Sequence, residues 1–123
     1  MKTLFLPLAL TCAALLAAGA DTPALQGKWK IHSSVQGYEN DEECTFTQAE
    51  NALTGSCTSE RGTAQLTGKV DGAKVTWTYK SQYDGNPLTV TYHGSLESAE
   101  KLSGTVVAEE YGAEGTFVAN LAK

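Results

Sequence analysis

The side chains that could perform catalysis are few and poorly placed for it. The two histidines, His32 and His93, alternate with the apolar Ile31 and Tyr92, so we expect both to point outward from separate strands. No serine lies in a Gly-x-Ser-x-Gly motif, and the carboxylates fall mostly in turns rather than across a cleft. The sequence therefore predicts a protein that is not an enzyme and holds neither a metal nor a cofactor.

A cluster of acidic residues lies in the first predicted loop. Its members are Glu39, Asp41, Glu42 and Glu43. Calcium sites need several oxygen ligands from a constrained loop, and the Asp-x-Asp-x-Asp-Gly spacing typical of one is absent. We therefore interpret this segment as a solvated acidic loop.

Aromatic side chains are the strongest candidates for a binding site. Those that fall on the apolar face of the predicted strands are Trp29, Phe46, Trp77, Tyr79, Tyr92 and Phe117. The polar residues that share this face are Ser33, Gln48 and Ser81. Aromatic walls with a few polar groups suit a small apolar ligand. The alternative is that these rings pack against one another and leave no cavity.

The first twenty residues have the pattern of a secretory signal peptide. Lys2 gives a basic start, an apolar run follows, and Ala18-Gly19-Ala20 supplies the small residues before a cleavage site. The apolar run is shorter than the roughly 20 residues of a membrane-spanning helix. Lipidation at Cys12 is the alternative, although the residues before it fit a lipobox poorly. We expect residues 1–20 to be removed and residues 21–123 to form a single domain that is secreted or periplasmic, with no membrane span.

Two cysteines, Cys44 and Cys57, remain after this cleavage. An isolated pair in an exported chain is typical of a disulfide, and two buried thiols are the alternative. The net charge of −5 argues against nucleic acid as a partner, because nucleic-acid binding needs a basic surface.

Alternation of apolar and polar residues dominates the rest of the chain, and no segment has the periodicity of an amphipathic helix. The predicted strands, separated by turn residues such as Asp71-Gly72 and Asp84-Gly85, are 27–35, 43–48, 53–58, 64–70, 73–81, 87–96, 102–109 and 114–121. A weak repeat also recurs along the chain, as Leu53-Thr54-Gly55, Leu66-Thr67-Gly68 and Leu102-Ser103-Gly104.

The turns predict how neighbouring strands align, since opposed residues in a hairpin have a constant sum of residue numbers. The predicted pairs are Cys44 with Cys57, Phe46 with Gly55, Gly55 with Leu66, Leu66 with Trp77, Trp77 with Tyr92, Tyr92 with Val106, and Val106 with Phe117. This alignment gives a sheet with one apolar face. We expect an all-β fold in which eight antiparallel strands close into an up-and-down barrel, because closure leaves no exposed edge. A two-sheet sandwich is the alternative.

The Gly27-Lys28-Trp29 motif at the start of the first strand resembles that of the calycin barrels, which comprise lipocalins, fatty-acid-binding proteins and avidins. With Leu53-Thr54-Gly55 and Gly115-Thr116-Phe117, it is also similar to small exported bacterial proteins of uncharacterised function. The resemblance implies a calycin-like barrel in which Trp29 closes one end. Residues 21–24 before this motif also resemble the short tail that periplasmic metalloprotease inhibitors insert into a protease active site.

These observations predict a secreted, monomeric, non-catalytic binding protein that holds a small apolar ligand at the mouth of its barrel. The alternative is a protein-interaction module, such as a protease inhibitor, that acts on a protein partner through residues 21–26 or through the turns.

Overall fold

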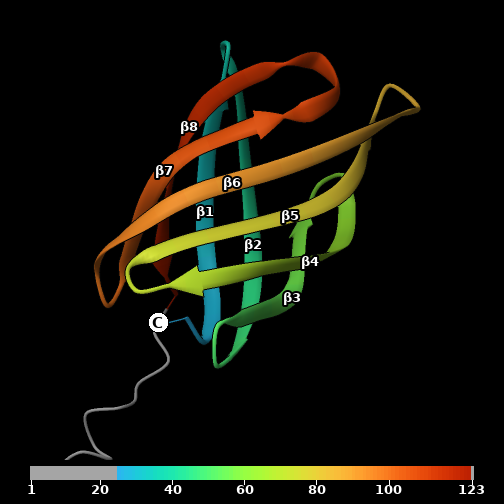
Figure 1. The fold of residues 1–123 in the computed structure, drawn as a ribbon. Helices are drawn as coiled ribbons and strands as arrows, with labels where there is room; N and C mark the ends of the chain where they lie inside the picture. The colour runs from blue at the N-terminus through green and yellow to red at the C-terminus, as the bar shows by residue number, and fades with distance from the viewer. Residues whose placement is uncertain (1–24, 123) are drawn as a thin grey trace, which may run out of the picture.

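A computed structural model describes residues 25–122, which form a closed barrel of eight antiparallel strands, each paired with its neighbours in sequence (Figure 1). The strands are β1 (Gly27–Val35), β2 (Tyr38–Ala49), β3 (Ala52–Ser59), β4 (Gly62–Asp71), β5 (Lys74–Tyr83), β6 (Asn86–Ser98), β7 (Lys101–Ala108) and β8 (Ala113–Leu121). One 3-10 turn, η1 (Glu109–Tyr111), precedes β8. The predicted up-and-down barrel is confirmed, whereas the predicted signal peptide and the tail 21–24 lie outside the described residues.

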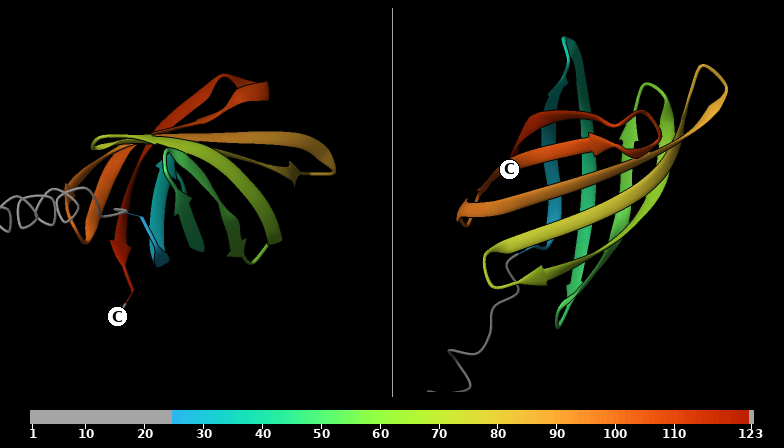
Figure 2. Two further views of the ribbon diagram at one scale, coloured as in Figure 1. Left: turned by 60° about the horizontal axis from the view of Figure 1, so that its bottom comes forward. Right: turned by 45° about the horizontal axis from the view of Figure 1, so that its top comes forward.

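Closure of the barrel is made by β1, which pairs with β2 on one side and with β8 on the other. The turns between the strands lie at the two ends of the barrel (Figure 2). We call the end that carries the turns after β1, β3, β5 and β7 the open end. The opposite end, where residue 25 enters and the turns after β2, β4 and β6 lie, is the closed end. Within residues 25–122, no helix is long and apolar enough to cross a membrane.

Leu25 anchors the start of the described chain at the closed end. Its side chain is fully buried, and its backbone N–H donates to Oε1 of Gln48 over 3.0 Å. The backbone N–H of Gln48 donates in turn to Oε1 of Gln26 over 2.6 Å. Residues 25 and 26 are therefore part of the barrel.

Five aromatic rings, which we call the ring cluster, fill the closed half of the barrel. They are Trp29, Phe46, Trp77, Tyr92 and Phe117, and each is almost completely buried. Trp77 lies at the centre: its ring stacks on Tyr92 with centroids 4.7 Å apart and meets Phe46 edge-on at 4.9 Å. Phe117 meets Trp77 edge-on at 5.5 Å. Offset and edge-to-face contacts of this kind stabilise a core beyond the burial of apolar area.

Three rings of the cluster face a glycine across the strand ladder. The pairs are Phe46 with Gly55, Trp77 with Gly68, and Phe117 with Gly104. These glycines end the three Leu-Thr/Ser-Gly repeats of the sequence. In each repeat the leucine points inward, and the glycine lies opposite a ring on a neighbouring strand.

The glycine–ring pairs correct two predicted alignments. Trp77 lies opposite Gly68 rather than Leu66, and Phe117 lies opposite Gly104 rather than Val106. Each correction is a shift of two residues, which keeps every side chain on its predicted face. The strands approach so closely at these glycines that no side chain fits there: a Cβ atom at Gly68 would lie 2.0 Å from the carbonyl oxygen of Thr76, and one at Gly104 would lie 2.0 Å from that of His93.

The other predicted pairs are confirmed: Cys44 with Cys57, Phe46 with Gly55, Gly55 with Leu66, Trp77 with Tyr92, and Tyr92 with Val106. A disulfide joins Cys44 to Cys57 across β2 and β3, with Cα atoms 4.0 Å apart. Both cysteines are buried inside the barrel.

Candidate functional site

The open half of the barrel contains two adjoining cavities of about 370 and about 400 Å³, which together we call the cup. The residues that line both cavities are Asn40, Arg61, Tyr79, Leu88 and Val90. The ring cluster lies below the cup, toward the closed end. The interior is therefore packed solid in one half and hollow in the other.

The wall of the larger cavity is apolar. Val35, Leu88, Val90, Val106 and Ala108 line it from β1, β6 and β7. Each of these side chains points inward because residues two apart on a strand share one face. The wall can therefore hold the apolar part of a small molecule.

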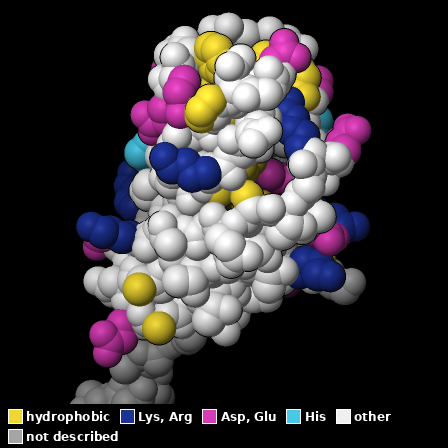
Figure 3. Space-filling model, turned by 90° about the vertical axis from the view of Figure 1, so that its right-hand side faces the viewer, with side chains coloured by type: hydrophobic (Ala, Val, Ile, Leu, Met, Phe, Trp, Pro, Cys, Tyr) yellow, Lys and Arg dark blue, Asp and Glu magenta, His cyan; other side chains and the backbone are white. Residues whose placement is uncertain are grey.

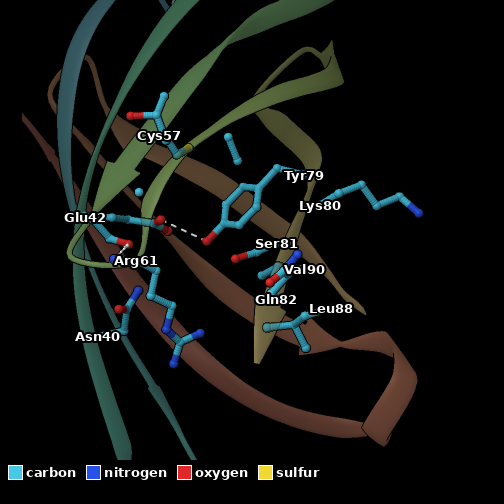
Figure 4. A pocket seen from close by; sticks show the side chains of 14 residues that line it. Asn40, Glu42, Cys57, Arg61, Tyr79, Lys80, Ser81, Gln82, Leu88 and Val90 are labelled. Carbon is cyan, nitrogen blue, oxygen red and sulfur yellow. Dashed lines mark hydrogen bonds between the residues drawn. The ribbon is translucent and has the colours of Figure 1, made fainter. Parts of the chain in front are cut away.

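Glu42 forms the floor of the smaller cavity together with Tyr79 (Figure 4), and Tyr92, which lines the larger cavity, also reaches its carboxyl group. The hydroxyl of Tyr79 donates to Oε1 of Glu42 over 2.8 Å, and the hydroxyl of Tyr92 donates to Oε2. The carboxyl group is buried, with the residue 8% exposed. These hydrogen bonds link β2 to β5 and β6 across the interior.

Burial raises the pKa of Glu42, because the ionised form loses its hydration. The hydroxyls of Tyr92 and Tyr79 and the more remote charge of Arg61 act in the opposite direction. Burial also raises the pKa of each tyrosine, so both phenols stay protonated and donate at neutral pH.

The charge of Glu42 has no ionic partner. Among the ion pairs of residues 25–122, none includes this carboxylate. A buried charge without a counter-charge costs several kcal/mol of desolvation, only part of which hydrogen bonds restore. The floor of the cup is therefore an uncompensated acid.

Tyrosines and one arginine surround the mouth of the cup. Tyr38, Tyr83 and Tyr111 are each about half exposed. The guanidinium of Arg61 lies 5.1 Å from the ring centroid of Tyr38 and 5.5 Å from that of Tyr83, and it donates a hydrogen bond to the Tyr38 hydroxyl. The ring of Tyr111 meets that of Tyr83 edge-on at 6.0 Å. In Figure 3, apolar and acidic side chains are visible in a hollow of the surface that has basic side chains beside it.

The structure separates the aromatic residues that were predicted to bind a ligand. Tyr79 and Tyr92 line the cup, and Tyr92 is also the member of the ring cluster that borders it. The other four members, Trp29, Phe46, Trp77 and Phe117, line neither cavity. Of the polar residues predicted beside them, Ser33 and Ser81 line the cup, and Gln48 instead binds residues 25 and 26. The expectation of a packed interior thus describes the closed half only.

The interpretation of residues 39–43 as a solvated loop is wrong. These residues belong to β2, which starts at Tyr38 rather than at residue 43. Glu39 and Asp41 point outward, and each accepts a hydrogen bond of 2.7 Å from the ring of His32. Glu42 points inward. The inward position of Glu42 could have been predicted, because Cys44 and Phe46 point inward at a spacing of two residues and the same spacing leads back to residue 42.

Both histidines point outward and are exposed, as predicted. Donor atoms of Glu42, Cys44 and Cys57 lie within 4.8 Å of one another, an arrangement that a metal ion could use in principle. Both sulfurs are in the disulfide, so they offer no thiolate, and this trio does not fit a metal.

No protein-family model and no curated protein sequence matches the chain. Among solved structures, the chain is similar to a redesigned β-barrel, with a TM-score of 0.63 and 14% identity. The match covers 81% of this chain and 93% of the other. At this identity, the likeness shows the barrel fold alone.

Proposed function

We propose that this chain is an exported, non-catalytic binding protein that holds a small molecule with an apolar body in the cup. The observation that carries the proposal is the unequal filling of the barrel. Five rings occupy the closed half, while the open half keeps about 400 Å³ behind an apolar wall. Small-molecule sites are typically concave, mostly apolar and about 300–1,000 Å³ in volume.

Two further features support the proposal. The disulfide and the signal-like residues 1–20 favour export to an oxidising compartment. Trp29 is fully buried near the closed end, where the calycin resemblance of the Gly27-Lys28-Trp29 motif expects a closing tryptophan. Calycin-like barrels with eight strands have interiors of a size that suits one small ligand.

The alternative, a protease inhibitor acting through residues 21–26, gains no support from residues 25 and 26. Leu25 is buried and both residues are hydrogen-bonded to Gln48, so they are not free to enter a partner. A tail that inhibits a protease would have to consist of residues before Leu25.

A substitution that fills the cup tests the proposal. Ala108 lines the wall near the open end, and Ala52 is exposed at the closed end. We expect the fluorescence of N-phenyl-1-naphthylamine to rise on binding the wild-type protein. Ala108→Trp should weaken this binding by about tenfold or more, because an indole occupies the space of the probe.

Ala52→Trp is the matched control, since it adds the same side chain outside the cup and should bind the probe as the wild type does. The proposal is refuted if the wild type does not bind the probe, or if both variants bind it equally well.

A further inference from the structure

The ionised carboxylate of Glu42 has acceptor capacity that the protein leaves unused. A carboxylate offers about four lone-pair sites, and Tyr79 and Tyr92 each occupy one of them. Because Glu42 lines the smaller cavity, the remaining sites are within reach of a molecule in the cup (Figure 4). Such a molecule would need a hydrogen-bond donor.

A cationic donor suits this floor better than a neutral one. No ion pair of the described residues neutralises Glu42, and its residue is only 8% exposed. Charge-assisted hydrogen bonds are about twice as strong as neutral ones, and the difference grows where water is excluded.

The mouth and wall of the cup suit an amine with an apolar body. The rings of Tyr38 and Tyr83 hold the guanidinium of Arg61 at the rim by cation–π contact, so that this cation does not pair with Glu42. Leu88, Val90 and Val106 line the path between this mouth and the floor. An amine of this shape would pass the rim and place its apolar part on the wall.

We infer that the ligand class of the cup is a small protonated amine with an apolar body, whose ammonium group pairs with Glu42. The inference rests on the proposed function and adds to it that the polar group of the ligand is a cation. Arg61 is the one basic residue that lines both cavities. Because it stays on the tyrosine rings of the rim, the carboxylate below remains open to the ligand.

Three compounds that share one apolar body test the inference. They are 1-naphthylmethylamine, 1-naphthylmethanol and the anion of 1-naphthaleneacetic acid, which carry a cationic, a neutral and an anionic head. Isothermal titration calorimetry measures their binding to the wild type, to Glu42→Gln and to Glu43→Gln. Glu43 is the matched control because it is the next residue of β2, points outward and has a side chain that is 43% exposed.

We expect the wild type to bind the amine about tenfold more tightly than the alcohol, and the alcohol more tightly than the carboxylate. Glu42→Gln should abolish the preference for the amine and leave the affinity for the alcohol within about twofold. Glu43→Gln should behave as the wild type. An equal preference for the amine in the wild type and in Glu42→Gln, or tighter binding of the carboxylate, overturns the inference while the proposed function stands. If none of the compounds binds, the proposed function fails and the inference with it.

A measurement on the wild type alone covers the case in which Glu42→Gln does not fold. The groups that face Glu42 are Tyr79, Tyr92 and Arg61, none of which changes charge between pH 5 and pH 8. Because burial raises the pKa of Glu42, the carboxyl loses its proton at a higher pH than an exposed glutamate does. Affinity for the amine should therefore increase with pH, and affinity for the alcohol should not. An affinity for the amine that is constant with pH overturns the inference.

Discussion

Replacing Gly68 by alanine should destabilise the protein strongly, because this glycine faces Trp77 across β4 and β5. A Cβ atom at position 68 would lie 2.0 Å from the carbonyl oxygen of Thr76, and 2.8 and 2.9 Å from Cα and Cβ of Trp77. These are backbone atoms or are fixed to the backbone, so a change of rotamer cannot relieve the contact. The two strands must move apart by roughly 1 Å, since real Cβ atoms essentially never come within 3.0 Å of another heavy atom.

Overpacking of this kind costs about 3 kcal/mol of unfolding free energy. Gly72→Ala is the matched control: the position has a φ of 64° and a new Cβ would meet nothing within 4 Å. It should cost about 1 kcal/mol, which is the strain of a left-handed alanine. Urea denaturation followed by tryptophan fluorescence measures both.

A loss for Gly68→Ala no larger than that for Gly72→Ala would refute the glycine–ring pairing. A variant at position 68 that does not fold at all agrees with it, provided that Gly72→Ala folds.

Three further predictions concern stability. Replacing Cys44 and Cys57 together by serine should lower the unfolding free energy by roughly 3 kcal/mol, because the disulfide closes a short loop of the unfolded chain; unchanged urea denaturation would contradict this. Leu25→Ala should cost about 3 kcal/mol, since the side chain is completely buried; a loss of a few tenths would mean that this residue belongs to a free tail. The pKa values of Glu42 and His32 are both raised in the folded protein, the first by burial and the second by hydrogen bonds to acidic side chains. Each group therefore binds its proton more tightly in the folded state, and stability should fall as the pH rises above 4.5 for Glu42 and above 6.5 for His32. Glu42→Gln should remove the part of this fall that begins near pH 4.5, and a variant that keeps it would show that another group is responsible.

The barrel could be predicted from the sequence because alternation, turn residues and the cysteine pair are local signals. The pair Cys44–Cys57 is the best example, since a turn at residues 50 and 51 aligns the two cysteines without knowledge of the rest of the fold. The alignment of β4 with β5 could not be predicted in the same way. It depends on the position of the turn, which lies at Gly72 and Ala73, with Asp71 opposite Lys74, rather than at Asp71 and Gly72.

The candidate site was predictable only in part. Tyr79 and Tyr92 were found because they alternate with outward residues. That these two line the cup and Trp77 does not depends on the alignment of all the strands. Glu42 was missed because an acidic segment favours a loop. Its burial becomes favourable only when the hydroxyls of both tyrosines reach it from the far side of the barrel.

The most direct test of the account is to determine which interior residues a neutral ligand contacts. Methyl chemical shifts, recorded by NMR during titration with 1-naphthylmethanol, report this residue by residue. The account predicts changes at Leu88, Val90 and Val106, which line the cup, and none at Leu53 and Leu102, which are buried near the closed end. Changes concentrated at Leu53 and Leu102, or no changes at saturating concentrations, would contradict the account.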